Sequence, residues 1–459
     1  MWSIRITSNF IITKLRQSAI KKRNICRKNS RQLKYGIYSQ KQVAKKSGYN
    51  EHWIDIRHGS RHPECLSLSR RSHGGFGARA GNTLNQSGFW EFNSKFPNEL
   101  YPSSELAHKF GSNFGLWVGP RGGYNFYGHL ADIVAKSGKG SKAGGSIDVA
   151  DRVYVKNLTD MFCDFQDRFQ VNYWKWDGFA DNQQYNHFPA ADGVPGYGNR
   201  HMTGGYQHMY HVTDLWEAWI DLMEAVRANA KENGIDNLWL SLTCYTNPSP
   251  WFLQWANSVW MQCVYDQKDA NFGTSKMDKQ MTCRDAVYYD FLVNHQFQFP
   301  LANLYNHDPI YGKEGTGMTI NSATDDNFQN YLYMQSTRGI TFWELLFSDS
   351  ILTDGKYEVT GEFLEWAEEN SHILRNAKIF GGMPDITKLE NGESSEYQSQ
   401  AYGFSCFDGT DGIISIRNPH SYQTKTVSFT FDRQQLRLRF RRGDPSDRRE
   451  ERRSSAPRA

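Results

Sequence analysis

One acidic residue stands at the end of a short hydrophobic stretch in the middle of the chain. Asp177 follows Val171–Trp176, a run of aromatic, β-branched and basic residues that predicts a strand, and Gly178 comes directly after it. Lys175 faces the same side of a strand as Asp177, because side chains alternate between the two faces. A nearby ammonium favours the ionised carboxylate that a nucleophile needs. Asp177 is therefore the candidate nucleophile, with a structural Lys175–Asp177 ion pair as the alternative.

Two tryptophans flank Lys175 in this stretch. Trp174 and Trp176 offer flat apolar faces of the kind that stack on sugar rings. A sugar-binding role for them would fit cleavage of a glycosidic bond by Asp177. The alternative is that both tryptophans belong to the core.

Glycoside hydrolysis needs a second carboxyl group, which protonates the leaving oxygen. Asp266 and Asp269 follow the predicted strand Ser258–Met261, and Arg284 and Asp285 lie a little further on. Asp266, next to a tyrosine and close after the strand, is the first choice for this acid. Asp269 stays open because no spacing rule separates the two. For each of them, a solvated loop carboxylate is the alternative.

Predicted helices alternate with short hydrophobic strands from about residue 103 onward. Such repeats favour parallel strands joined by crossovers, as in a closed (β/α) barrel or a doubly wound sheet. No glycine-rich nucleotide motif follows any strand, and polar residues cluster just past strand ends, which favours the barrel. The expected helices are 103–113, 149–169, a helix capped by Asp214 and stopped by Gly234, 284–294 and 327–337; the expected strands are 114–118, 171–176, 238–242, 258–261 and 340–346.

The two ends of the chain differ from its middle in charge. Residues 1–80 hold 18 Lys and Arg against 3 Asp and Glu, and residues 433–459 hold 10 Arg against 4 Asp and Glu, within a chain of net charge +4. This composition predicts disordered basic ends rather than a nucleic-acid-binding arm, because neither end interleaves aromatic residues with the basic ones. The predicted organisation is a basic, poorly ordered region at 1–85, the barrel at 86–390, a partial β-sandwich at 391–432 and a disordered Arg-rich tail at 433–459.

Several other classes of function are disfavoured. No run of 18 apolar residues occurs, so no membrane span is predicted. The first 17 residues lack a continuous apolar stretch and a cleavage site, so no secretory signal is predicted and the cytoplasm is the default compartment. His208 and His211 have a spacing that could hold zinc, but no further ligand pattern supports it, and neither a metal nor a cofactor is expected. Seven scattered cysteines indicate free thiols.

At these residues the chain resembles the melibiase-like, α-galactosidase-type retaining glycoside hydrolases. The Lys175-Trp176-Asp177 run is similar to the nucleophile motif that follows the fourth strand of that family. The resemblance extends over roughly residues 88–431. Its other matching segments are Trp90-Glu91-Phe92-Asn93, Lys95-Phe96-Pro97, Phe114-Gly115-Leu116-Trp117, Asn247-Pro248-Ser249-Pro250-Trp251, the segment through Asp266, and Gly412–Pro419.

The resemblance implies a (β/α)8 (TIM) barrel that cleaves α-galactosides or related α-linked sugars with retention. Asp177 would attack the anomeric carbon, and Asp266 would act first as acid and then as base. The residues implied in substrate binding are Lys175, Trp117, Trp176, Arg284 and Asp285. The only partner implied is a carbohydrate, with no nucleic acid and no membrane.

One departure from the family concerns the beginning of the barrel. Such barrels start with strands that carry paired aspartates, whereas the residues before Trp90 contain no Asp-Asp pair and no clear strand pattern. We therefore predict a barrel that lacks its first strands, with open edges and weak stability or activity. The alternative function is a non-catalytic carbohydrate-binding barrel.

Overall fold

The fold is described from a computed structural model of the whole chain. For the strands β1 (Trp2–Ile6), β2 (Phe10–Leu15), β3 (Trp53–Arg57) and β4 (Cys65–Ser69), only the backbone path is described. The described residues are 2–6, 10–15, 53–57, 65–69, 91–92, 96–109, 112–120, 127–143, 146–177, 209–243, 249–260, 270, 273–305, 310–312, 319–339, 345–348, 351–384, 400–409, 411–419 and 425–429.

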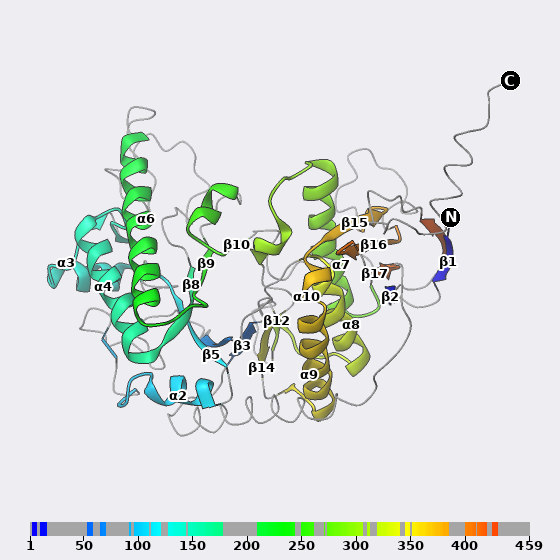
Figure 1. The fold of residues 1–459 in the computed structure, drawn as a ribbon, viewed down its shortest axis with the longest axis horizontal. Helices are drawn as coiled ribbons and strands as arrows, with labels where there is room; N and C mark the ends of the chain where they lie inside the picture. Colours follow the sequence, from blue (N-terminus) through cyan, green and yellow to red (C-terminus); the bar gives the residue numbers. More distant parts are fainter. Residues whose placement is uncertain are drawn as a thin grey trace, which may run out of the picture.

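A ten-stranded, mostly parallel sheet forms the centre of the molecule (Figure 1). Strand β3 is its antiparallel member, paired with β4 on one side and β14 on the other. The other strand pairs are parallel, as helix crossovers require. In order across the sheet, the strands are β11 (Leu304–Tyr305), β10 (Ser258–Trp260), β9 (Trp239–Thr243), β8 (Val171–Asp177), β5 (Asn113–Val118), β4 (Cys65–Ser69), β3 (Trp53–Arg57), β14 (Leu345–Ser348), β12 (Ile310–Tyr311) and β13 (Thr319–Ile320).

Helices connect these strands along the chain. The α/β class and the alternation of helix and strand expected from the sequence are confirmed. The helices are α2 (Tyr101–Lys109), α3 (Tyr127–Lys136), α4 (Arg152–Phe169), α6 (Met209–Glu232), α7 (Lys276–Tyr289), α8 (Asp325–Ser336), α9 (Asp354–Glu369) and α10 (Ser371–Leu374), with short turns η2 (Pro250–Gln254), η3 (Asp290–Asn294) and η4 (Leu301–Asn303) and a hairpin of β6 (Lys142–Ala143) and β7 (Ser146–Ile147).

Two helices begin at least five residues earlier than the sequence predicted. Asp214 lies inside α6 rather than at its cap, and α7 begins at Lys276, where the side chain of Ser275 accepts a hydrogen bond from the backbone N–H of Asp278. The end of α6 follows the prediction. Gly234 adopts a φ of 70°, a left-handed conformation that glycine takes at little cost, just after the last helical turn.

The packing of β8 explains why tryptophans occupy one face of this strand. Trp174 and Trp176 are fully buried on one face, against Phe162 of α4. Trp219 of α6 meets the Trp176 ring edge-on, with the ring centroids 6.2 Å apart. The opposite face carries Lys175 and Asp177, and it is called the site face of the sheet below.

The first 85 residues contribute strands that the sequence analysis did not predict. β3 and β4 stand beside β5 in the main sheet, at the position where the sequence analysis predicted that the first barrel strands are missing. Both segments alternate apolar and polar residues, Trp-Ile-Asp-Ile-Arg and Cys-Leu-Ser-Leu-Ser, which is a strand pattern. The strongly basic composition of this region concealed it.

A second, antiparallel sheet gathers strands from both ends of the chain. Its order is β15 (Ala377–Gly381), β16 (Tyr402–Phe407), β17 (Gly412–Arg417) and β2 (Phe10–Leu15), and β1 (Trp2–Ile6) pairs separately with β18 (Lys425–Phe429). The predicted short strands near 400–430 are thus present. Residues 10–15, expected to be disordered, form an edge of this sheet. The tail at 433–459 lies outside the described residues. Among the described residues, no helix is long and apolar enough to cross a membrane.

Candidate functional site

Asp177 is the last residue of β8 and lies on the site face, where its carboxylate meets an indole from the next strand. The Nε1–H of Trp117, on β5, donates a hydrogen bond of 3.1 Å to Oδ2 of Asp177. The register of the two strands explains this contact, because Trp117 is the direct partner of Lys175 and its long side chain reaches two residues further along β8. Asp177 is 9% exposed. The carboxylate is thus nearly enclosed, and one of its oxygens is held by a neutral donor.

Lys175 lies on the same face, deeper in the sheet. It is only 2% exposed, and its Nζ lies 5.6 Å from the centroid of the Tyr305 ring on β11. An ammonium over an aromatic face is attracted by the negative ring quadrupole. The prediction that Lys175 and Asp177 share a face is therefore confirmed, and it brings a buried positive charge into the neighbourhood of Asp177.

Hydroxyl groups from three neighbouring strands complete the site face. Ser241 and Ser258 contact each other at 2.6 Å, and Nε1 of Trp239 lies 3.0 Å from the Ser258 hydroxyl. Thr243, the register partner of Asp177 on β9, shares a short hydrogen bond with the Tyr305 hydroxyl. All of these hydroxyl groups are buried.

These hydroxyl residues were not among the predicted site residues. A signal was available in β9, where Trp239, Ser241 and Thr243 alternate with Leu240 and Leu242. A strand buried on both faces normally reads as a continuous apolar run. Polar residues at every second position therefore indicate a face lined for polar contacts.

Trp176 is not placed where a substrate could reach it. The residue is fully buried on the face opposite Asp177, and its ring stacks on Phe162 at a centroid distance of 5.1 Å and an interplanar angle of 13°. The alternation of a strand forces this placement, because Asp177 and its immediate neighbour in sequence must face opposite sides. The core interpretation of Trp176 holds, and its expected contact with substrate is not supported.

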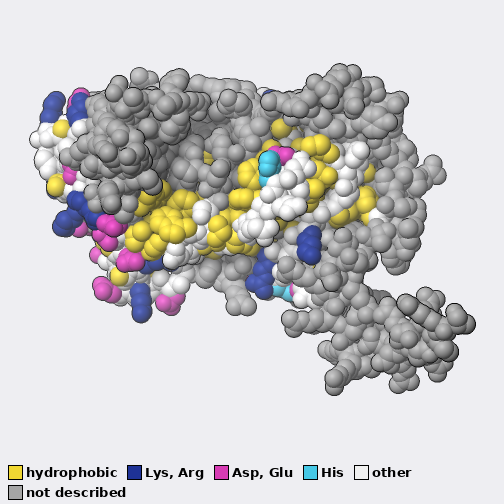
Figure 2. Space-filling model, turned by 90° about the horizontal axis from the view of Figure 1, so that it is seen from above, with side chains coloured by type: hydrophobic (Ala, Val, Ile, Leu, Met, Phe, Trp, Pro, Cys, Tyr) yellow, Lys and Arg dark blue, Asp and Glu magenta, His cyan; other side chains and the backbone are white. Residues whose placement is uncertain are grey.

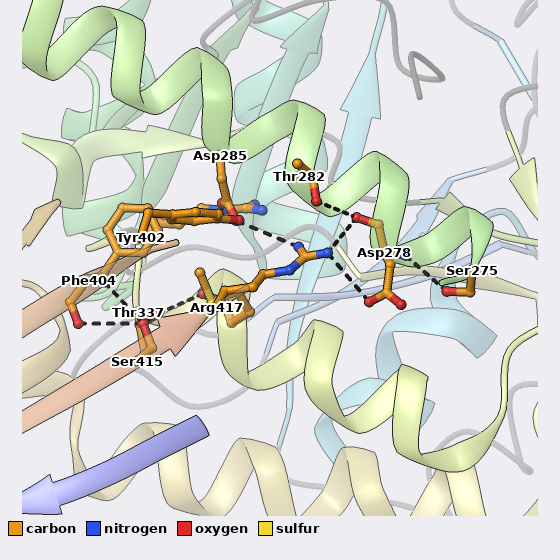
Figure 3. A network of polar contacts seen from close by, with 11 residues as sticks. Ser275, Asp278, Thr282, Asp285, Thr337, Tyr402, Phe404, Ser415 and Arg417 are labelled. Carbon is orange, nitrogen blue, oxygen red and sulfur yellow. Dashed lines mark hydrogen bonds and ion pairs between the residues drawn. The ribbon is translucent and has the colours of Figure 1, made fainter. Parts of the chain in front are cut away.

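Asp285 lies inside a buried polar network that joins α7 to the second sheet (Figure 3). Its Oδ1 accepts a hydrogen bond of 2.6 Å from Nε of Arg338, and both side chains are fully buried. Its Oδ2 accepts a short hydrogen bond from the Tyr402 hydroxyl. Burial raises the pKa of Tyr402, so this phenol keeps its proton and donates it. Asp285 is thus a structural anion rather than a substrate contact.

Two further residues extend this buried region. Arg417 of β17 donates to the backbone oxygen of Asp278 at 2.7 Å and so ties the second sheet to α7 (Figure 3). Arg284 is 4% exposed, and its charge acts on Tyr331 of α8, whose pKa is raised chiefly by burial. Arg284 therefore lies where α7 meets α8, and its expected role in holding sugar hydroxyls is not supported by this position.

The remaining predicted residues fall outside the described part of the chain. Asp266 and Asp269 belong to residues 261–269, and His208 precedes the first described residue of α6. The side chain of His211 is likewise not described. Within the described ranges, no group of three or more His, Cys, Asp or Glu side chains is arranged to hold a metal ion. The choice between Asp266 and Asp269 stays a prediction.

Comparison with known proteins gives structural likenesses only. No family model and no curated protein matches the chain. A variant of the GH36 α-galactosidase AgaA from Geobacillus stearothermophilus, in complex with 1-deoxygalactonojirimycin, is similar at 11% identity and a TM-score of 0.46, over 81% of this chain and 45% of that one. The α-galactosidase TtGalA from Thermus thermophilus, in complex with stachyose, is similar at 13% identity and a TM-score of 0.37. The match covers 62% of this chain and 56% of that one.

A third similar structure is AmyP in complex with maltose, at 9% identity and a TM-score of 0.42, over 83% of this chain and 78% of that one. The chain spans less than two thirds of the length of AgaA and of TtGalA. Several of the solved structures that this chain is similar to are α-galactosidases and related glycoside hydrolases.

Proposed function

We propose that this chain hydrolyses α-glycosidic bonds, with an α-galactoside or a related α-linked sugar as substrate. The observation that carries the proposal is the placement of Asp177. Asp177 is the last residue of the parallel strand β8. Its carboxylate is nearly enclosed and accepts a hydrogen bond from the Trp117 indole. Enzymes of parallel α/β architecture place their reacting groups at the carboxyl ends of such strands. The Lys-Trp-Asp run, which resembles the nucleophile motif of the melibiase-like hydrolases, supports the same role.

The proposed reaction has two steps and takes place at the carboxyl end of β8. Asp177 attacks the anomeric carbon and forms a covalent ester, while Asp266 (or Asp269) protonates the leaving oxygen. The same acid, now a base, then removes a proton from water, which attacks the anomeric carbon and releases Asp177. A single enclosed carboxylate held by a donor suits the nucleophile better than the acid, because an acid must carry a proton.

Lys175 supports this chemistry through its charge. Its ammonium is buried on the same face as Asp177, and a buried positive charge attracts negative charge that develops on that face during the reaction. Trp117 is assigned both to hold Asp177 and to face the sugar, since its indole remains partly exposed beside the carboxylate.

Replacement of Asp177 by Ala tests the proposal. We expect hydrolysis of p-nitrophenyl α-galactoside to fall by at least about 10³-fold, because loss of a nucleophile costs several kcal/mol of transition-state stabilisation. Added azide should restore part of the nitrophenolate release by attacking the anomeric carbon in place of the carboxylate. Asp160→Asn, at an exposed helical ion pair, is the control and should leave the rate unchanged. An unchanged rate in the Asp177 variant would refute the assignment.

A further inference from the structure

A cluster of three tryptophans and one phenylalanine lies on the surface between α6 and η2. It is called the η2 aromatic cluster here and consists of Trp216, Trp251, Phe252 and Trp255. Trp251 is 39% exposed, one of four large hydrophobic side chains that are exposed among the described residues. Figure 2 shows a face of the molecule on which hydrophobic side chains are exposed next to acidic and basic ones.

The rings of the cluster leave the indole of Trp251 without a parallel partner. Trp216 meets it at an interplanar angle of 87°, Phe252 at 72° and Trp255 at 66°, with centroid distances between 4.8 and 5.5 Å. Edge-on neighbours fix the orientation of an aromatic ring without stacking on its face. Trp251 is thus held in a defined orientation by its three ring neighbours and keeps 39% of its surface exposed.

Local structure holds this surface rigid. Ser249 caps η2 by accepting a hydrogen bond from the backbone N–H of Trp251, and Pro250 begins the turn. Phe252 is buried at 5% exposure and anchors the turn to the core. Arg227 of α6 donates to the backbone oxygen of Trp255 at 2.6 Å and so closes the far end. A platform held in this way loses little conformational freedom when it binds a ligand.

The charges beside the cluster define the kind of ligand that fits. Glu217 and Asp221 are exposed on α6 and share one cation, Arg152, and Glu224 accepts from Nε1 of Trp255 at 3.3 Å. Arg227 adds a second cation beside Trp255, so these charges nearly balance, and such a surface favours neither a polyanion nor a polycation. A flat, uncharged ligand with hydroxyl groups suits both features, because its apolar face can stack and its hydroxyls can donate to carboxylates.

The position of the cluster relates it to the candidate site. η2 follows β9, whose last residue, Thr243, is the register partner of Asp177. Trp216 lies in the first half of α6, the helix that leads from the carboxyl end of β8 back to the start of β9. The cluster therefore lies along α6 and in the connection from β9 to β10, where Trp255 contacts Glu224 and Arg227 of the second half of α6.

We propose that the η2 aromatic cluster is a second carbohydrate-binding site, in which the face of a sugar ring of an oligosaccharide stacks on Trp251. The inference rests on the proposed function for the class of ligand, an oligosaccharide rather than another flat, neutral molecule. It adds a residue and a surface that the Asp177 site does not include. A chain with both sites binds oligosaccharides more tightly than single sugars.

The test measures binding of stachyose by calorimetry, in an Asp177→Asn background that prevents turnover. Trp251→Leu keeps an apolar side chain but removes the flat ring, and Trp251→Phe keeps a smaller ring. We expect about tenfold weaker binding for the leucine variant, equivalent to about 1.4 kcal/mol, and a smaller loss for the phenylalanine variant. Tyr101→Leu, at an exposed ring on α2 with 41% exposure, is the matched control and should bind like the parent.

Equal affinity of the parent and the leucine variant would overturn the inference. A parent chain that sediments as a dimer and a leucine variant that sediments as a monomer would also overturn it, because the cluster would then be a contact between two copies. Thermal unfolding checks that each variant folds. Failure of the proposed function is recognised separately, since it appears as unchanged hydrolysis after Asp177→Ala and does not affect this binding comparison.

Discussion

The hydrogen bond from Trp117 to Asp177 makes a kinetic prediction that separates two roles for the tryptophan. Trp117→Phe removes the Nε1–H donor and keeps an aromatic ring at the same position. A hydrogen bond to a charged group contributes about 1.5–3 kcal/mol. The carboxylate loses its charge when it forms the glycosyl ester and regains it when water displaces it. The donor therefore favours the second step and opposes the first.

With about half of the charge regained in the second transition state, the loss of the donor raises that barrier by about 0.8–1.5 kcal/mol. This corresponds to a second step that is slower by about 4- to 12-fold. For p-nitrophenyl α-galactoside, whose leaving group departs easily, we expect kcat and KM to fall together, because the covalent intermediate accumulates. Rapid mixing should show a burst of nitrophenolate close to one equivalent of enzyme.

Trp239→Phe is the matched control for this prediction. Its indole N–H also lies on the site face, but it donates to the hydroxyls of Ser241 and Ser258 rather than to a carboxylate. We expect no burst and little change in kcat from this variant. A Trp117→Phe enzyme with unchanged kcat and a raised KM would refute the reasoning, because the indole would then act only as a substrate contact.

Three further predictions concern the framework around the site. Trp176→Ala should lower the free energy of unfolding by about 3–5 kcal/mol in denaturant titrations, as expected for a fully buried tryptophan. Asp285→Ala should cost a similar amount, since it leaves the buried charge of Arg338 without its anion, whereas Asp160→Asn should change stability by less than about 1 kcal/mol. Burial raises the pKa of Cys163 to about 11, so its alkylation rate, followed by mass spectrometry, should keep rising above pH 9 in the folded protein and level off earlier in urea.

The sequence alone predicted the positions of the elements whose hydrophobic residues recur with a clear period. β8 and β9 lie within a residue or so of their predicted positions, and Leu215, Trp219 and Val226 of α6 are buried. These segments have patterns that only one kind of element satisfies. β3 and β4 were missed because their alternation lies in a segment whose basic composition predicts disorder.

The candidate site was predictable only in part. Asp177 and Lys175 are related by local spacing, which sequence alone reveals. The contact between Trp117 and Asp177 joins residues 60 positions apart and depends on the register of β5 and β8. Asp285 was predicted as a substrate contact because it is a carboxylate next to an arginine in the sequence. Its hydrogen-bond partners, Arg338 and Tyr402, belong to elements distant in sequence, so its structural role could not be predicted.

The role of Asp177 as a nucleophile is tested most directly by trapping the covalent intermediate. A fluorinated glycosyl fluoride of the α-galacto series forms a glycosyl ester that breaks down slowly, and acid quenching followed by proteolysis and mass spectrometry locates it. We predict a single labelled peptide that contains residues 171–177, with the sugar on Asp177. A label on another carboxylate, or continued turnover with no labelled peptide, would contradict this account.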